Sequence, residues 1–269
     1  MLRITSIMIL GFATGMLSGL LGIGGGAVLV PALVYLIGLS QHRAHGTSLA
    51  CMAPVALSTA LFYSGRHHVD WLVAIELAVG GVIGAGIGVR ICTLLSARRL
   101  RTFFGLFLVA IGIRMMYEAR GVFAFAAATG PVVAGHTFPP DQLPGALAVV
   151  MIGIITGTAS GLLGVGGGIV MIPALVLLFG YTQKLAQGIS LAVIIPVSIS
   201  GTLIHSIHGN VRWNVAVWLA LGGIAGGLAG ARIANVEVSD PALRGMFGLL
   251  TLVMGGLMMR RRSQGLYSR

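Results

Sequence analysis

The sequence predicts an all-α, polytopic helical membrane protein made of two inverted-topology repeats, each with a glycine-broken helical hairpin followed by three transmembrane helices. Three observations lead to this fold class: the composition, a glycine motif that occurs twice, and a matching order of apolar segments in the two halves. Hydrophobic residues make up 57% of the chain, charged residues 9%, and the mean hydropathy is +0.99. A soluble domain carries about 25% charged residues. Because the long runs are apolar on all faces, they suit helices surrounded by lipid.

The glycine motif is the feature around which the chain is organised. Residues 18–33 read SGLLGIGGGAVLVPAL, and residues 160–175 read SGLLGVGGGIVMIPAL. Glycine costs about 1 kcal/mol in a helix interior, so four glycines within five positions end a helix. A proline in the first turn of the next helix costs little. Each copy therefore predicts a helix, a break and a second helix.

The repeat extends well beyond this motif. The alignment needs no gap from Gly11 to Ile91, and we expect four regions: a first transmembrane repeat (1–117), a linker (118–143), a second transmembrane repeat (144–262) and a C-terminal tail (263–269). Two-half construction is typical of secondary transporters. The segment after each break is shorter than the roughly 20 residues of a spanning helix. The apolar segments are about 4–21, 26–38, 45–64, 71–95 and 102–117, then 145–163, 168–180, 188–206, 213–233 and 244–259.

The basic residues predict the orientation. Clusters stand before the last segment of the first half (Arg98, Arg99, Arg101) and after the last segment of the second half (Arg260, Arg261, Arg262). Lysine and arginine concentrate in cytoplasmic loops, so equivalent loops of the two halves fall on opposite sides, and both termini are cytoplasmic. We explain the net charge of +11 by this excess of basic residues in cytoplasmic loops. We expect the lipid bilayer as a partner and no nucleic acid, and we leave a homodimer open.

The two glycine breaks are the candidate site. Non-helical backbone at membrane depth persists only where protein or a water-filled cavity satisfies its polar groups. The helices that start at the breaks would turn unpaired N–H groups and positive dipole ends into such a cavity, which favours an anion. The alternative is close helix packing by small residues. The predicted substrate-binding glycines are Gly24, Gly25, Gly26, Gly166, Gly167 and Gly168.

Further donors stand at the start of each third segment. Thr47 and Ser48 in the first half, and Gln187 and Ser190 in the second, are predicted to bind substrate. The two serines have an alternative role as helix N-terminal caps. The glycines of the fourth segments, such as Gly80 and Gly84, are instead expected to pack helices together.

Candidates for coupling or gating are His45, His205, Glu76, Arg90 and Arg232. Glu76 is the one carboxylate inside an apolar run, and a role at the membrane interface is its alternative. Snorkelling to the interface is the alternative for the two arginines. His205 and His208 stand one helical turn apart, as metal ligands can, but without nearby carboxylates we expect no metal. No GxxxxGK[ST] motif occurs, so we expect that this chain does not consume ATP. We also expect no cofactor, no catalytic residue and no enzyme.

The paired GxGGGxxxxPAL stretches, each followed by A-x-G-x-S, resemble the TauE/SafE family of membrane permeases, also called sulfite exporters. The likeness runs from Gly11 to Met259, and Ile189 stands where the first copy has Thr47. The resemblance implies transport of sulfur-containing anions, such as sulfite or organosulfonates, across the bacterial inner membrane. We therefore expect a secondary transporter, an exporter that works by alternating access with proton or ion coupling. The alternatives are a passive anion channel and a metal-ion carrier that uses His205 and His208.

Overall fold

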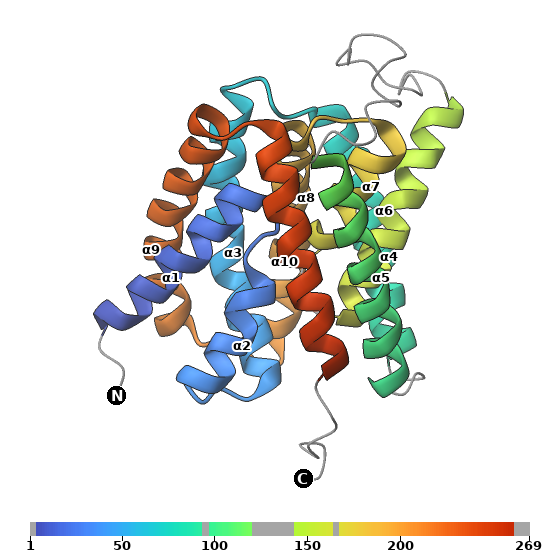
Figure 1. Cartoon of the computed structure of the whole chain (residues 1–269). Helices are drawn as coiled ribbons and strands as arrows, with labels where there is room; N and C mark the ends of the chain where they lie inside the picture. Colours follow the sequence, from blue (N-terminus) through green and yellow to red (C-terminus); the bar gives the residue numbers. More distant parts are fainter. Residues whose placement is uncertain (1–3, 93–96, 120–142, 164–166, 261–269) are drawn as a thin grey trace.

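The computed structural model describes residues 4–92, 97–119, 143–163 and 167–260, and this part of the chain is all-helical. The predicted linker, apart from its ends, the C-terminal tail and Gly166 lie outside the described residues. The helices are α1 (Ile4–Leu21), α2 (Gly26–Leu36), α3 (Gln41–Ser64), α4 (Trp71–Cys92), α5 (Ala97–Ala119), α6 (Leu143–Leu163), α7 (Gly168–Phe179), α8 (Gln183–Ile207), α9 (Trp213–Arg232) and α10 (Asp240–Arg260), with a π-helical segment η1 (Ile233–Glu237) after α9 (Figure 1).

The third segment of each half begins earlier than its apolar run predicts. Ser40 and Thr182 have extended backbone, and helices α3 and α8 start directly after them. Thr182 accepts a hydrogen bond from the Leu185 amide at 3.3 Å, which makes it a side-chain cap. Ser48 and Ser190 lie well inside these helices, so the capping role considered for them is wrong. Hydropathy missed the first turns because they are polar.

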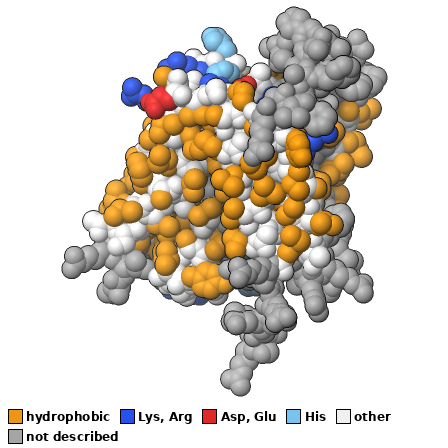
Figure 2. Space-filling view, in the orientation of Figure 1, with side chains coloured by type: hydrophobic (Ala, Val, Ile, Leu, Met, Phe, Trp, Pro, Cys, Tyr) orange, Lys and Arg blue, Asp and Glu red, His pale blue; other side chains and the backbone are white. Residues whose placement is uncertain are grey.

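The outer surface of the described helices is apolar. Side chains such as Ile9, Leu106 and Leu203 are more than half exposed, and Figure 2 shows hydrophobic side chains over most of the visible face, with charged and histidine side chains gathered at its upper end. Within the described residues, four helices are long and apolar enough to cross a membrane: Ile4–Leu21, His42–Ser64, Gln183–Ile207 and Trp213–Glu237. An apolar surface of this kind is stabilised by contact with lipid tails, and in water it would promote aggregation.

The first glycine motif breaks the chain as predicted. Gly22, Gly24 and Gly25 have φ angles of 72°, 74° and 72°, a left-handed conformation that residues with a Cβ rarely adopt. Helix α1 ends at Leu21 and α2 begins at Gly26, and in Figure 1 the start of α1 and helix α2 both lie toward the lower end of the molecule. The hairpin therefore enters and leaves at one end.

Helices of one half pack against helices of the other. Helix α1 packs on α9, α6 on α4, α3 on α8 and α5 on α10. A Cβ on Gly11, Gly15 or Gly19 would overlap the carbonyl oxygen of Leu219, Gly223 or Gly227, so α1 and α9 run parallel. The same register joins α6 to α4, where Gly153 and Gly157 meet Leu77 and Gly81.

The equivalent helices α3 and α8 run antiparallel. Gly46, near the start of α3, lies against the backbone of Asn210, just beyond the end of α8. Gly188, near the start of α8, lies against the backbone of His68, just beyond the end of α3. Helices α5 and α10 are also antiparallel, since Gly105 faces Met259 and Gly245 faces Ala119.

The glycines of the fourth segments pack helices, as the sequence predicts, and α4 offers a matched test. A Cβ on Gly84 would overlap the carbonyl oxygen of Ile154 in α6, whereas a Cβ on Gly86 would meet nothing within 4 Å. We expect Gly84→Ala to destabilise the protein by about 1–3 kcal/mol, the usual cost of overpacking. Gly86→Ala should be neutral or stabilising by about 0.5–1 kcal/mol. Thermal unfolding in detergent measures both, and equal shifts would contradict the packing.

Candidate anion-binding site

The first glycine break lies against the start of α7, and residues 164–166 of the second break lie outside the described residues. A Cβ on Gly168, the first residue of α7, would lie 2.8 Å from the carbonyl oxygen of Gly22 and 2.9 Å from Cα of Ile23. Ser190 Oγ in α8 donates a hydrogen bond to the same Gly22 oxygen at 3.0 Å. The first break is therefore held directly against the start of α7 and the buried face of α8. Only a residue without a side chain fits at this contact.

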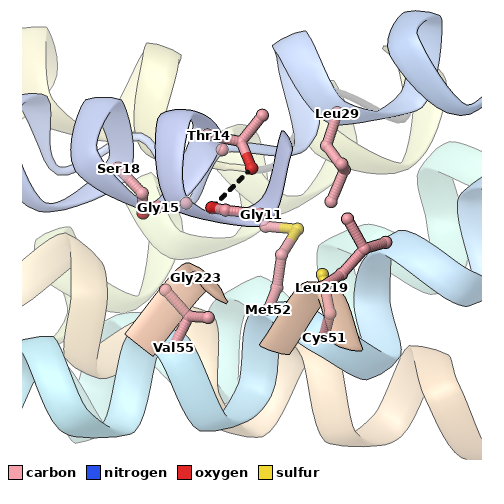
Figure 3. A pocket seen from close by; sticks show the side chains of 12 residues that line it. Gly11, Thr14, Gly15, Ser18, Leu29, Cys51, Met52, Val55, Leu219 and Gly223 are labelled. Carbon is pink, nitrogen blue, oxygen red and sulfur yellow. Dashed lines mark hydrogen bonds between the residues drawn. The ribbon is translucent and has the colours of Figure 1, made fainter. Parts of the chain in front are cut away.

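A small cavity adjoins the first break, between α1, α3 and α9. Figure 3 shows Thr14 and Ser18 from α1, Met52 and Val55 from α3, and Leu219 from α9 around it, and Gly24 and Gly25 of the break and Leu29 of α2 are among the other residues that line it. The space open to the centre of a water molecule is about 10 Å³, which holds about one water. An oxyanion of four or more heavy atoms needs more room. The cavity beside the first break is therefore closed to such a substrate, and the substrate cavity that the sequence predicts between the two breaks stays a prediction.

Two flexible side chains close the break on the side of Gly24. A Cβ on Gly24 would lie 2.7 Å from Ile194 Cδ1 and 2.8 Å from Met52 Cε. Met52 and Ile194 occupy equivalent positions of α3 and α8, four residues after Ser48 and Ser190. Because these contacts are made by the ends of side chains, a rotamer change can open them without moving the backbone.

Ser18 is a buried polar group that the sequence reasoning did not place at the site. Its side chain is 1% exposed, and its hydroxyl has no hydrogen-bond partner among the described residues. The nearby Thr14 hydroxyl, in contrast, donates to backbone oxygens of its own helix, at 2.9 Å to Leu10 and 3.1 Å to Gly11 (Figure 3). A buried hydroxyl without a partner is costly and rare. The sequence feature that could have identified Ser18 is its position as the first residue of the repeated glycine motif.

The predicted side-chain donors divide into two groups. Gln187 and Ser190 lie at the breaks: a Cβ on Gly22 would be 2.8 Å from Gln187 Cβ, and Gln187 Oε1 accepts a hydrogen bond from Tyr63 at 3.0 Å. Ser48 donates to Met52 Sδ at 3.5 Å, so it touches a side chain that lines the cavity. Thr47 lies elsewhere, because its Oγ1 accepts from the Arg212 amide and joins α3 to the start of α9.

The candidates for coupling are spread over both ends of the molecule. His45 and His205 come together where α3 begins and α8 ends, since a Cβ on the adjacent Gly46 would lie 2.8 Å from His205 Cβ. Arg232 is the exposed last residue of α9, and Arg90 lies in α4 with its side chain outside the described part. No three His, Cys, Asp or Glu side chains of the described residues are placed to hold a metal ion.

Glu76 lies half-buried near the start of α4, close to the loop between α7 and α8. Burial and then the charges of Asp70 and Glu76 raise the pKa of Tyr181, in that loop, to about 12. The carboxylate therefore belongs to the end of the molecule where α4 and α8 begin. It lies at the opposite end from His45 and His205.

Comparison with known proteins decides the family. The family model described as "Sulfite exporter TauE/SafE" matches residues 2–115 and 121–268. The chain belongs to the TauE/SafE family. A "Probable membrane transporter protein" of Xylella fastidiosa is 32% identical over 248 residues, covering 91% of this chain and 89% of the relative. One from Bacillus subtilis is 31% identical over 240 residues, covering 84% and 87%. No solved structure matches the chain.

Membership of the TauE/SafE family agrees with the apolar surface and the spanning helices. The protein is a multi-pass membrane protein of a transporter family, and it is not an enzyme. A further relative from Methanocaldococcus jannaschii, again named a probable membrane transporter protein, is 28% identical over 275 residues, with 96% of each chain covered. The TauE/SafE likeness therefore extends over both glycine breaks and nearly all helices.

Proposed function

We propose that this TauE/SafE protein is a secondary transporter that exports a small sulfur-containing anion, such as sulfite or an organosulfonate, by alternating access. The observation that carries the proposal is the contact of the first glycine break with Gly168, at the start of α7, together with the buried Ser18 hydroxyl, which has no hydrogen-bond partner among the described residues. A helix N-terminus stabilises a partly buried anion by up to about 2 kcal/mol. Placing one charge in the membrane costs about 2.5–3.5 kcal/mol on insertion scales. Two helix starts and a few hydroxyl donors together offset this cost for one negative charge.

We also propose that the two halves form an inverted repeat. The support is the packing: α1 with α9 and α6 with α4 use equivalent glycines, while the equivalent helices α3 and α8, like α5 and α10, run antiparallel. A two-fold axis in the membrane plane relates such halves, as in many secondary transporters. Alternating access would then be a rocking of the two hairpins around the paired breaks, with Met52 and Ile194 moving out of the substrate's way.

The charges favour placing both termini in the cytoplasm, in the bacterial inner membrane. The described acidic residues lie at one end, where α4, α8 and α10 begin, and include Asp70, Glu118 and Asp240. The opposite end holds the start of α5 with its arginine cluster, together with the start of α1 and the end of α10. Basic residues mark the cytoplasmic side. His45 and His205 would then serve coupling or gating on that side, and Glu76 on the other.

Flux into liposomes tests the transport proposal. The purified protein is reconstituted, and uptake of sulfite and methanesulfonate is followed with and without an imposed proton gradient. A coupled transporter concentrates its substrate against a gradient, whereas a passive channel only equilibrates it. The metal-carrier alternative predicts zinc uptake that is lost in a His205→Ala/His208→Ala variant. Absence of anion flux in a folded, correctly inserted protein would contradict the proposal.

Ser18 offers the most direct test of the site. We expect Ser18→Ala to weaken substrate binding about tenfold, which is about 1.4 kcal/mol, because a hydrogen bond to a charged ligand is lost. Thermal stability should be unchanged or slightly higher, since the hydroxyl has no partner among the described residues. The control is Ser198→Ala, a serine equally buried whose hydroxyl donates to Ile194 at 2.6 Å. Substrate affinity is measured from the concentration dependence of flux. If Ser18→Ala binds substrate as tightly as the wild-type protein, Ser18 does not contact the substrate.

A further inference from the structure

One face of α8 carries two glutamine side chains into the interior of the molecule. Gln183 and Gln187, one turn apart, are both 0% exposed. Both amide atoms of Gln183 and the Nε2 atom of Gln187 have no hydrogen-bond partner among the described residues. Each unpaired amide group in an apolar interior costs free energy that a leucine of similar size would not. Two such groups on one helix face need a physical reason.

The second glutamine is held in place from the opposite half. The Tyr63 hydroxyl, at the end of α3, lies 3.0 Å from Gln187 Oε1 and 2.9 Å from the carbonyl oxygen of Gly19. Three residues further along α8, Ser190 donates to Gly22 in the first break. Gln183, Gln187, Ser190 and Tyr63, which we name the α8 amide tract, thus form a polar path that ends at the paired breaks.

The other end of this path reaches a polar part of the surface. Lys184, next to Gln183, donates from Nζ to the carbonyl oxygen of Asn235 at 3.2 Å. The Asn235 side chain also bonds to the His68 ring and to the carbonyl oxygen of Ala231. Asn235 lies in the π-helical segment η1, a conformation often found at functional sites. The tract therefore connects the end of the molecule where α8 begins with the breaks near its middle.

We propose that the α8 amide tract is a binding site for a singly charged oxyanion, on its way between the paired breaks and the end where α8 begins. The proposal rests on the proposed function and narrows its substrate class. Amide NH₂ and hydroxyl groups are hydrogen-bond donors that suit sulfonate or hydrogensulfite oxygens. They carry no formal charge, so they compensate an ion only through hydrogen bonds.

Charge decides between a monoanion and a dianion. Residues 4–65 contain one Lys, Arg, Asp or Glu, which is Arg43, and residues 143–211 contain one, which is Lys184. Both stand in the first turn of a helix, so α3 and α8 themselves place no other charged side chain along the path. The nearest charge from a neighbouring helix is negative, because Asp240 of α10 acts electrostatically on Tyr63. The cost of taking an ion out of water rises with the square of its charge. Neutral donors that offset this cost for one charge therefore fall far short for two.

Sulfate and methanesulfonate test the charge preference, because both are tetrahedral at sulfur and differ mainly in charge. We expect methanesulfonate to bind the reconstituted protein at least tenfold more tightly than sulfate, measured by competition with sulfite flux at fixed pH. Sulfite itself should move faster as the pH falls and hydrogensulfite replaces the dianion. Equal competition by sulfate, in a protein that does move sulfite, overturns this inference alone. If the protein transports neither sulfite nor methanesulfonate, both the proposed function and this inference are contradicted.

Variants of the tract separate this role from a structural one. Gln183→Leu and Gln187→Leu should each lower methanesulfonate flux at least tenfold while the melting temperature stays level or rises. Asn214→Leu, which replaces an exposed amide of α9, is the matched control and should change neither quantity. Gln183→Lys should shift the preference toward sulfate, because it places a positive charge beside the path. Normal flux in both leucine variants overturns the proposal, and so does a Gln183→Lys protein that is folded and shows no shift.

Discussion

Replacing Gly168 by alanine is expected to lower transport more than a hundredfold. The new Cβ would lie 2.8 Å from both the Gly22 oxygen and Ser190 Oγ, and 2.9 Å from Ile23 Cα. Two of these three atoms are backbone, so they move only if the breaks separate. Separation moves the start of α7 away from the first break and weakens the hydrogen bond from Ser190 to the Gly22 oxygen. Substrate flux into liposomes measures the loss.

The control for this change is Gly256→Ala in α10, where a Cβ meets nothing within 4 Å. This variant should transport normally. We expect Gly168→Ala itself to lose about 1–3 kcal/mol of stability, the usual cost of overpacking, and to remain folded by size-exclusion chromatography and circular dichroism. A folded Gly168→Ala protein with normal flux would mean that the contact of the two breaks has no part in transport.

The second large effect is expected for Gly24→Ala, which should abolish transport where Gly38→Ala does not. Both glycines have a φ angle of 74°, so alanine carries the same backbone strain at either position, about 1–2 kcal/mol. The surroundings differ. At Gly24 the Cβ would meet Ile194 Cδ1 and Met52 Cε, and at Gly38 it would meet nothing within 4 Å. The extra methyl group therefore meets the side chains that close the first break only at Gly24.

A double variant makes this comparison sharper. Met52→Ala removes one of the two side chains that meet the new methyl group, so Gly24→Ala/Met52→Ala should recover part of the flux lost in Gly24→Ala. Both single glycine variants should show a similar drop in melting temperature, since they share the backbone strain. Equal flux in Gly24→Ala and Gly38→Ala would show that substrate does not pass the first break.

The helices were predictable because each one is an apolar run bounded by residues with strong local preferences. The three left-handed glycines before Gly26, which are Gly22, Gly24 and Gly25, stop α1 whatever the tertiary structure, and the break is where the sequence predicts it. The starts of α3 and α8 were missed because their first turns, from Gln41 and Gln183, are polar. Hydropathy alone does not recognise such a turn.

The site was predictable in outline and not in detail. That the first break lies against the helices of the other half follows from a non-helical segment in a medium that leaves its backbone groups no other partner. No local rule indicates that Thr47 bonds to Arg212, that Met52 and Ile194 cover Gly24, or that Ser18 is left without a partner among the described residues. These facts depend on how α3, α8 and α9 pack across the two halves. That packing is set by contacts between residues far apart in the sequence.

The exchange of helices between the halves has a consequence for biosynthesis. The glycine face of α1 is covered by α9, which leaves the ribosome only after most of the chain has been made. Until then the translocon, or neighbouring lipid, must accommodate a tilted hairpin whose partner does not yet exist. Neither half can complete its own core during translation. The tertiary packing of this protein therefore forms late, because the first half can pack fully only after the second half has been synthesised.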